Sequence, residues 1–203
     1  MISLFWGLWQ YLFSKAEVHL LIIGLDYAGK TTLLEQLKTM FGKKAGIPLD
    51  KIPPTVGLNI AKVDISRTNV IFWDLGGQER LRAIWSKYYS ESHGVVFVVD
   101  SSDPARFDEA RAALASMLAH PELSDVPLLV LANKSDLDTA QTSAELTARL
   151  ELDRLAESHQ WTQRPISALT TSGIADAVTW FVSAVKQTDR FQAKQQQATN
   201  SRV

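Results

Sequence analysis

A glycine-rich run near the beginning of the chain has the residue types that bind phosphate groups. Its residues are Gly24, Leu25, Asp26, Tyr27, Ala28, Gly29, Lys30, Thr31 and Thr32. They match the pattern G-x-x-x-x-G-K-[ST], in which glycines let backbone N–H groups turn toward phosphate oxygens. The lysine adds a positive charge for the β- and γ-phosphates, and the hydroxyl of Thr31 is a ligand for Mg²⁺. This run therefore predicts a site for a nucleoside triphosphate and its magnesium ion.

A second candidate group follows an apolar run and spans Asp74 to Gln78. An aspartate at this position can hold Mg²⁺ through a water molecule, and Gly77 can present its backbone N–H to the γ-phosphate. Gln78 can orient the water molecule that attacks this phosphate. Alone, these residues would form an ordinary turn. Downstream of a phosphate-binding run, they predict the hydrolytic part of the site.

A third group follows another apolar run and contains Asn133, Lys134 and Asp136. A carboxylate here can accept hydrogen bonds from N1 and the exocyclic amine of guanine, which adenine does not offer. An unpaired buried acceptor would penalise the wrong base. Ser167 and Ala168 fit a remaining backbone contact to the guanine oxygen. Together these residues predict a site that selects guanine over adenine.

The spacing of apolar residues places these motifs at the ends of strands. Runs that are apolar on both faces predict strands at residues 18–23, 60–65, 69–73, 94–99 and 128–131. Helical patterns lie at residues 30–41, 106–118, 144–158 and 174–186. Residues 66–68 separate two of the strands, so we expect an antiparallel hairpin at a sheet edge. The alternation predicts a doubly wound α/β domain with ligands at the carboxyl ends of the strands.

The composition excludes several other kinds of chemistry. The 203-residue chain is long enough for one domain with a full core. Its 21 basic and 22 acidic residues leave a net charge of −1, which argues against a nucleic-acid partner. The chain has no cysteine, so disulfides, thiolate metal sites and cysteine-borne lipid anchors are excluded. Residues 188–203 are polar and rich in glutamine, and we expect a disordered tail there.

Taken in order, these motifs resemble the Arf and Arf-like family of small GTPases. The matching runs are Gly-Leu-Asp-x-Ala-Gly-Lys-Thr-Thr from residue 24, Pro-Thr-Val-Gly-x-Asn from residue 54, Trp-Asp-Leu-Gly-Gly-Gln-Glu from residue 73 and Asn-Lys-x-Asp from residue 133. The resemblance covers residues 17–187 and implies a GTPase domain with a mostly parallel six-stranded sheet. It implies GTP and GDP as ligands, Mg²⁺ as cofactor, and Thr55 as the threonine that closes on the metal and the γ-phosphate. Lys30, Thr55, Gly77 and Gln78 are then the expected catalytic group.

The same resemblance implies surfaces for protein partners. Family members use an aromatic and apolar patch for effectors, and the matching positions are Leu58, Trp73 and Tyr88. Leu58 departs from the phenylalanine that is usual in Arf proteins. The chain shows no evident arginine that would complete the site, so we expect slow intrinsic turnover, which a partner's arginine raises by roughly 10³–10⁵-fold. The expected partners are an exchange factor, a GTPase-activating protein and effectors.

The first 14 residues form an apolar segment with a narrow polar stripe. Small or polar residues recur with helical spacing at Ser3, Gly7, Gln10 and Ser14. The large apolar positions are Met1, Ile2, Leu4, Phe5, Trp6, Leu8, Trp9, Tyr11, Leu12 and Phe13. Such side chains suit a membrane interface. We expect residues 1–14 to form an amphipathic helix that packs on the domain with GDP and moves to lipid with GTP.

Residue 2 bears on the way in which the chain reaches a membrane. Arf proteins carry glycine there for myristoylation, whereas this chain has Ile2, which excludes that lipid. Ile2 and the long stretch 41–54 resemble the branch of Arf-related proteins, whose members are N-terminally acetylated and captured at the Golgi by a membrane protein receptor. We therefore expect the protein in the cytosol and on the cytoplasmic face of Golgi or trans-Golgi membranes, acting in membrane trafficking.

Other functions remain open alternatives. A Sar-type coat-assembly GTPase also begins with an unmyristoylated aromatic segment, but that branch carries histidine at the position of Gln78. A scaffold that binds GTP without significant turnover would use the same nucleotide residues. Asn133 and Asp136 argue against a generic ATPase with this type of phosphate loop.

Overall fold

A single sheet organises the computed structural model, which describes residues 17–42 and 46–200. Its six strands lie in the order β2-β3-β1-β4-β5-β6. The strands are β1 (Glu17–Ile23), β2 (Leu58–Ile65), β3 (Thr68–Leu75), β4 (Gly94–Asp100), β5 (Leu128–Asn133) and β6 (Trp161–Pro165). All neighbouring pairs are parallel except β2 and β3. The predicted mostly parallel α/β fold is confirmed.

The β2–β3 hairpin forms the predicted antiparallel edge of the sheet. Its pairing runs from Leu58 opposite Leu75 to Ile65 opposite Thr68. The two residues between the strands, Ser66 and Arg67, have φ angles of 49° and 60°. Two consecutive left-handed residues make a tight turn whose twist matches that of the strands. On β2, buried and exposed side chains alternate, as expected for an edge strand with one face on the core.

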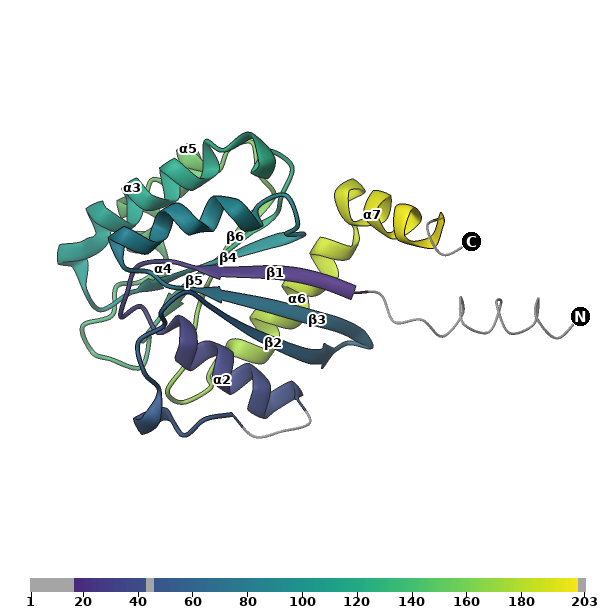
Figure 1. Cartoon of the computed structure of the whole chain (residues 1–203). Helices are drawn as coiled ribbons and strands as arrows, with labels where there is room; N and C mark the ends of the chain where they lie inside the picture. Colours follow the sequence, from purple (N-terminus) through teal and green to yellow (C-terminus); the bar gives the residue numbers. More distant parts are fainter. Residues whose placement is uncertain (1–16, 43–45, 201–203) are drawn as a thin grey trace, which may run out of the picture.

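Helices cover both faces of the sheet (Figure 1). One face packs against α2 (Lys30–Phe41) and α6 (Ile174–Lys186), through side chains such as Leu33 and Phe181. The other face packs against α3 (Phe107–Leu118), through side chains such as Leu114. The same side of the sheet carries α4 (Ser143–Arg149) and α5 (Leu152–Leu155). Central strands β4 and β5 are buried almost throughout because both faces are covered.

Short 3₁₀ segments connect several of these elements. They are η1 (Leu49–Lys51), η2 (Glu79–Tyr88), η3 (Pro104–Arg106) and η4 (Pro121–Leu123). Pro104 begins η3, where its missing N–H costs nothing, and α3 continues directly from that turn. The segment η2 follows β3 and the Gly76–Gly77 pair, which come at the carboxyl end of that strand.

The prediction of one continuous helix over residues 144–158 is wrong. The chain instead forms the separate helices α4 and α5, which meet at Glu151, whose φ angle is 52°. A left-handed residue ends one helix, and the next begins at once in a new direction. The carboxylate of Glu151 is held by Arg111 of α3 and by Arg154, so the break is fixed by tertiary contacts.

The disordered tail predicted for residues 188–203 is also wrong over most of its length. Asp189–Asn200 forms helix α7. The Phe191 side chain is buried against the core under α6, and the Arg190 guanidinium donates hydrogen bonds to the carbonyls of Tyr89 and Ser92. Gln195 donates to the carbonyl of Glu17, which places α7 beside the start of β1 (Figure 1). One buried ring and a set of backbone carbonyls therefore hold a helix whose composition alone suggests disorder.

Candidate functional site

The phosphate loop, residues 24–31, connects β1 to α2 as the sequence predicts. Gly29 has a φ angle of 90°, and a side chain there would collide with the amide of Asn133, so glycine is required on two grounds. Tyr27 also lies in the left-handed region, and its side chain is exposed. Thr31 and Thr32 lie in the first turn of α2, whose N-terminal end attracts anions.

Lys30 is a buried cation inside this loop. Its side chain is 6% exposed, and Nζ donates to the carbonyl of Leu25 at 2.7 Å. Burial lowers the pKa of Lys30 to about 8, an effect that the charges of Asp74 and Asp26 partly oppose. A charge with so little solvent is stabilised by an anion, and the β- and γ-phosphates of a nucleotide would supply one.

Two hydroxyls and one carboxylate meet beside the loop. The Oγ1 atoms of Thr31 and Thr55 lie 2.6 Å apart, and Thr31 Oγ1 donates to Asp74 Oδ2 at 2.8 Å. Burial raises the pKa of Asp74, while its hydrogen bond from Thr31 acts in the opposite direction. Asp74 Oδ1 is buried and finds no hydrogen-bond partner among the described residues. Oxygen ligands and a spare buried carboxylate oxygen suit Mg²⁺, so these residues fit the predicted cofactor.

Gly77 lies directly against the phosphate loop. A side chain on Gly77 would collide with the backbone of Gly24, Leu25 and Asp26, so only glycine allows this approach. The structure thus brings two of the predicted groups together. The carboxamide oxygen of Gln78 accepts a hydrogen bond from Arg80 at 3.1 Å.

Asn133 joins the predicted base-binding segments to the phosphate loop. Its side chain is 2% exposed; Nδ2 donates to Ala28 O at 2.8 Å, and Oδ1 accepts from Ala168 N at 2.8 Å. Ser167 is buried, and its Oγ accepts from the backbone of Thr170. The structure therefore gives Asn133 a bracing position between three loops.

The two remaining predicted base residues follow Asn133 on the same loop. Lys134 pairs with Asp100 at the end of β4, and Asp136 is exposed to solvent. An exposed carboxylate at the carboxyl end of β5 is free to meet a ligand that lies over this edge of the sheet.

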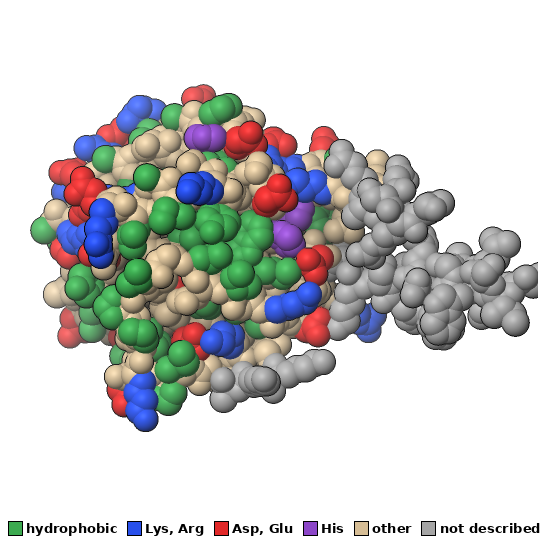
Figure 2. All heavy atoms as spheres, in the orientation of Figure 1, with side chains coloured by type: hydrophobic (Ala, Val, Ile, Leu, Met, Phe, Trp, Pro, Cys, Tyr) green, Lys and Arg blue, Asp and Glu red, His purple; other side chains and the backbone are tan. Residues whose placement is uncertain are grey.

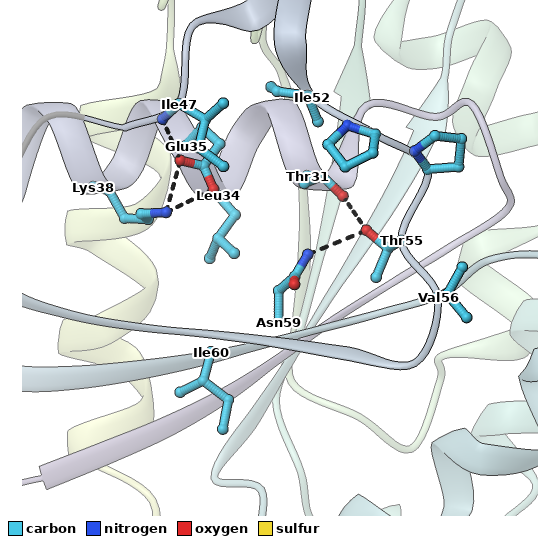
Figure 3. Close-up of a pocket in the computed structure, with 12 residues that line it drawn as sticks. Thr31, Leu34, Glu35, Lys38, Ile47, Ile52, Thr55, Val56, Asn59 and Ile60 are labelled. Atoms are coloured by element: carbon cyan, nitrogen blue, oxygen red, sulfur yellow. Dashed lines mark hydrogen bonds and ion pairs between the residues drawn. The ribbon is translucent and has the colours of Figure 1, made fainter.

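A cavity of about 280 Å³ opens beside the threonine pair (Figure 3). In the close-up, Thr31, Thr55 and Asn59 converge on its floor, while Glu35 and Lys38 of α2 lie at its side. The Glu35 carboxylate accepts from Lys38 and from the backbone of Ile47, which ties the chain after α2 to that helix. The amide of Asn59 donates to Thr55 Oγ1 at 3.3 Å and supports its position.

The predicted effector positions form one half-buried apolar patch. Leu58, Trp73 and Tyr88 all pack against the core on the α3 side of the sheet. The rings of Trp73 and Tyr88 are 5.6 Å apart, and His19 meets the edge of Trp73 at 4.9 Å. Figure 2 shows hydrophobic side chains gathered at the centre of this face with histidine beside them. All three side chains therefore pack against the same core cluster, and their role in effector binding stays a prediction.

Several residues at the site escaped the sequence-based prediction. Arg82 donates to the carbonyl of Gly77, and the indole of Trp85 donates to the carbonyl of Gly76. Arg106 binds both the backbone and the carboxylate of Asp26. None of these belongs to a short motif; the only signal was a tryptophan within a charged segment that follows the glycine pair.

The expectations for residues 1–14 lie outside the described residues. Within the described ranges, no helix combines the length and the apolar character needed to cross a membrane.

Residues 5–185 match the ADP-ribosylation factor family. The chain is 44% identical over 187 residues to ADP-ribosylation factor-related protein 1 of Bos taurus and of Homo sapiens, an alignment that covers 91% of this chain and 93% of each relative. It is 42% identical over 180 residues to ADP-ribosylation factor-like protein 3 of Saccharomyces cerevisiae, covering 87% of this chain and 89% of that relative.

A solved structure agrees with this match. The Arl6 BBS3 small GTPase of Trypanosoma brucei, determined with the bound nucleotide analogue GppNp, superposes with a TM-score of 0.76 at 30% identity and covers 85% of this chain and 99% of that one. The phosphate loop, the Gly77 approach and these matches lead to one conclusion: the chain belongs to the ADP-ribosylation factor family and is a GTPase that acts as a GTP-binding switch.

Proposed function

We propose that this GTPase uses Mg²⁺ at the Thr31–Thr55–Asp74 cluster and that its nucleotide state controls attachment to Golgi or trans-Golgi membranes. The convergence of two hydroxyls on a buried carboxylate with a spare oxygen is the observation that carries the metal assignment. Bound there, Mg²⁺ would neutralise charge on the β- and γ-phosphate oxygens. Thr31 and Thr55 would hold it directly and Asp74 through water.

The proposed hydrolysis uses the residues around the phosphate loop. Lys30 binds the β- and γ-phosphate oxygens, and the N–H of Gly77 donates to the γ-phosphate. Gln78 turns from Arg80 and orients a water molecule in line with the scissile bond. The water oxygen bonds to the γ-phosphorus as the bond to the β–γ bridging oxygen breaks, which gives GDP and inorganic phosphate.

The proposed base recognition depends on Asp136. Its exposed carboxylate accepts from N1 and the exocyclic amine of guanine, while Lys134 covers the base from the same loop. Asn133 keeps the phosphate loop and the Ser167–Ala168 segment in register with that contact. Because adenine cannot donate both hydrogen bonds, it leaves the carboxylate unpaired.

The closed arrangement of the loops supports a switch that responds to the γ-phosphate. Thr55 contacts Thr31, and Gly77 contacts the phosphate loop, so both approach the space next to the β- and γ-phosphates. Loss of the γ-phosphate on hydrolysis would remove the ligand that holds both segments there. Leu58 and Trp73 lie between these segments in sequence and Tyr88 follows the second, so the patch that they form would change with them.

Membrane attachment is proposed from residues 1–14 and from the relatives. The segment has aromatic and aliphatic side chains that suit an interface, and Ile2 replaces the glycine needed for myristoylation. The similarity to ADP-ribosylation factor-related protein 1 fits a Golgi-associated role. The resemblance of Ile2 and residues 41–54 to the Arf-related branch further implies an acetylated Met1 and a membrane protein receptor. An exchange factor, a GTPase-activating protein and effectors complete the proposed cycle.

Replacing Gln78 by Leu tests the hydrolytic assignment. We expect single-turnover hydrolysis of bound GTP to slow roughly tenfold or more because no side chain then orients the attacking water. The affinity for GTP should stay within about twofold, since a side chain that orients water contributes little to ground-state binding. Gln160→Leu, at an exposed glutamine before β6, is the matched control. Equal hydrolysis rates in the parent and Gln78→Leu would contradict the role of Gln78 in orienting water.

A further inference from the structure

The two peptide groups on either side of Gly77 are both held by side chains of η2. Trp85 Nε1 donates to Gly76 O at 3.1 Å, and Arg82 Nε donates to Gly77 O at 2.9 Å. The N–H of Gly77 belongs to the same planar peptide as the carbonyl of Gly76. The indole of Trp85 therefore sets the direction of the N–H of Gly77, and Arg82 fixes the following peptide.

Arg82 is in turn held by a chain of charged groups. Its Nη2 pairs with Glu109 Oε1, and Glu109 Oε2 accepts from Arg106 Nε at 3.0 Å. Arg106 then donates from Nη1 to Asp26 O at 2.8 Å and from Nη2 to Asp26 Oδ1 at 2.6 Å. This ionic chain runs from Asp26 in the phosphate loop through Arg106 and Glu109 to Arg82 and the carbonyl of Gly77.

Glu109 is the link between the two arginines. Its hydrogen bonds from Arg106 and Arg82 hold the pKa of the carboxyl below its usual range, so it is ionised at neutral pH. Its side chain is 41% exposed, and ion pairs in such positions contribute little to folding stability. Glu109 contributes little to folding stability but links two loops at the site, so it is suited to orienting the Gly77 peptide.

We propose that Arg82 and Glu109 are positioning residues that hold the Gly77 peptide for the γ-phosphate, with Arg106 and Asp26 anchoring them to the phosphate loop. The role rests on the proposed contact between Gly77 and the γ-phosphate. GDP lacks that phosphate, so the ionic chain favours the triphosphate over the diphosphate. Arg82 acts through the forked shape of its guanidinium group, which binds Gly77 O and Glu109 at the same time.

The test compares the affinities of GppNp and GDP, each with Mg²⁺, in the full-length protein and in Glu109→Gln. We expect Glu109→Gln to weaken GppNp binding relative to GDP by roughly three- to tenfold, the size expected for loss of one charge-assisted contact. Single-turnover GTP hydrolysis should slow by a similar factor. Asp108→Asn is the matched control: it removes a carboxylate from the next position of α3, one that pairs with Arg111 instead.

Arg82→Lys separates orientation from charge. It keeps the positive charge but cannot bridge Gly77 O and Glu109 as a fork, so we expect the same loss of GppNp preference as in Glu109→Gln. Thermal unfolding of the GDP-bound variants should match that of the GDP-bound parent. The double variant should lose no more GppNp preference than either single variant, because both substitutions break the same ionic chain.

Two results would overturn the positioning role. One is an unchanged GppNp-to-GDP preference in a folded Glu109→Gln protein. The other is an equal loss of affinity for both nucleotides, which would mean that the ionic chain only supports the phosphate loop. A parent protein that binds GppNp and GDP without any preference would contradict the proposed γ-phosphate contact itself, and this inference with it.

Discussion

His93 is a buried histidine at the start of β4, outside the nucleotide site. Its Nδ1 accepts from the backbone N–H of His19 at 2.9 Å, and its ring meets Phe191 of α7 at 5.3 Å. Burial, together with the positive charges of Lys194 and Arg190, lowers the pKa of His93 to about 3. The imidazole is therefore neutral in the folded protein at any pH near neutrality.

This neutral histidine predicts acid sensitivity of folding. The unfolded chain binds a proton on His93 below its ordinary pKa of about 6.5, whereas the folded chain does not until about 3. The free energy of unfolding should therefore fall as pH falls through this window, by at most about 1.4 kcal/mol per pH unit. Urea denaturation between pH 4 and 7 measures this slope.

His93→Asn supplies the comparison, because its amide oxygen can still accept from His19. The slope of this variant should be shallower than that of the parent. Identical slopes in the parent and His93→Asn would show that His93 gains its proton without unfolding.

The sequence identified the phosphate-loop motif but not the side chains that hydrogen-bond to the neighbouring Gly76–Gly77 segment. Gly29, Lys30 and Thr31 belong to a motif whose spacing is set by the ligand, so their positions follow from the chain itself. Arg82 and Trp85 act on carbonyls that reach them only because η2 folds back along Gly76 and Gly77. Any arginine or tryptophan in a helical segment has the same local pattern, so their roles require the tertiary structure.

At the level of elements, the strands were predicted well where both faces are buried. Central strands β4 and β5 consist of continuous apolar residues and could be recognised from composition. Strand β6, Trp161–Pro165, is polar and half-exposed, and among the described residues it pairs with β5 alone. The break between α4 and α5 could not be predicted, because no glycine or proline marks it. Glu151 is held there by Arg111 and Arg154.

Helix α7 predicts a stability effect that a disordered tail would not give. Phe191 is 5% exposed, so Phe191→Ala should lower the free energy of unfolding by about 3 kcal/mol. Chemical denaturation of the full-length protein measures this, with Gln192→Ala, at the exposed neighbouring position, as the control. If both variants unfold like the parent, α7 contributes no packing energy.

On the scale of the whole molecule, the candidate nucleotide site and helix α7 lie at opposite ends of strand β1. The phosphate loop and the Asn133 loop follow the carboxyl ends of β1 and β5, whereas α7 lies at the start of β1 (Figure 1). The segment of residues 1–16 joins the domain at Glu17 of β1, and the Asn69 amide of β3 donates to the Glu17 carboxylate at 2.8 Å. Strand β3 leads directly to Asp74 and Gly77, so β1 and β3 connect the two ends physically.

Flotation of the full-length protein with liposomes tests the proposed membrane switch most directly. The protein is loaded with GDP or with GppNp and mixed with vesicles of Golgi-like lipids, with and without Golgi membrane proteins. We predict flotation with GppNp and little with GDP, enhancement by the membrane proteins, and loss of flotation when Trp6 and Trp9 are both replaced by Glu, because charged side chains oppose burial at the interface. Equal flotation in the two nucleotide states would contradict nucleotide control of membrane attachment.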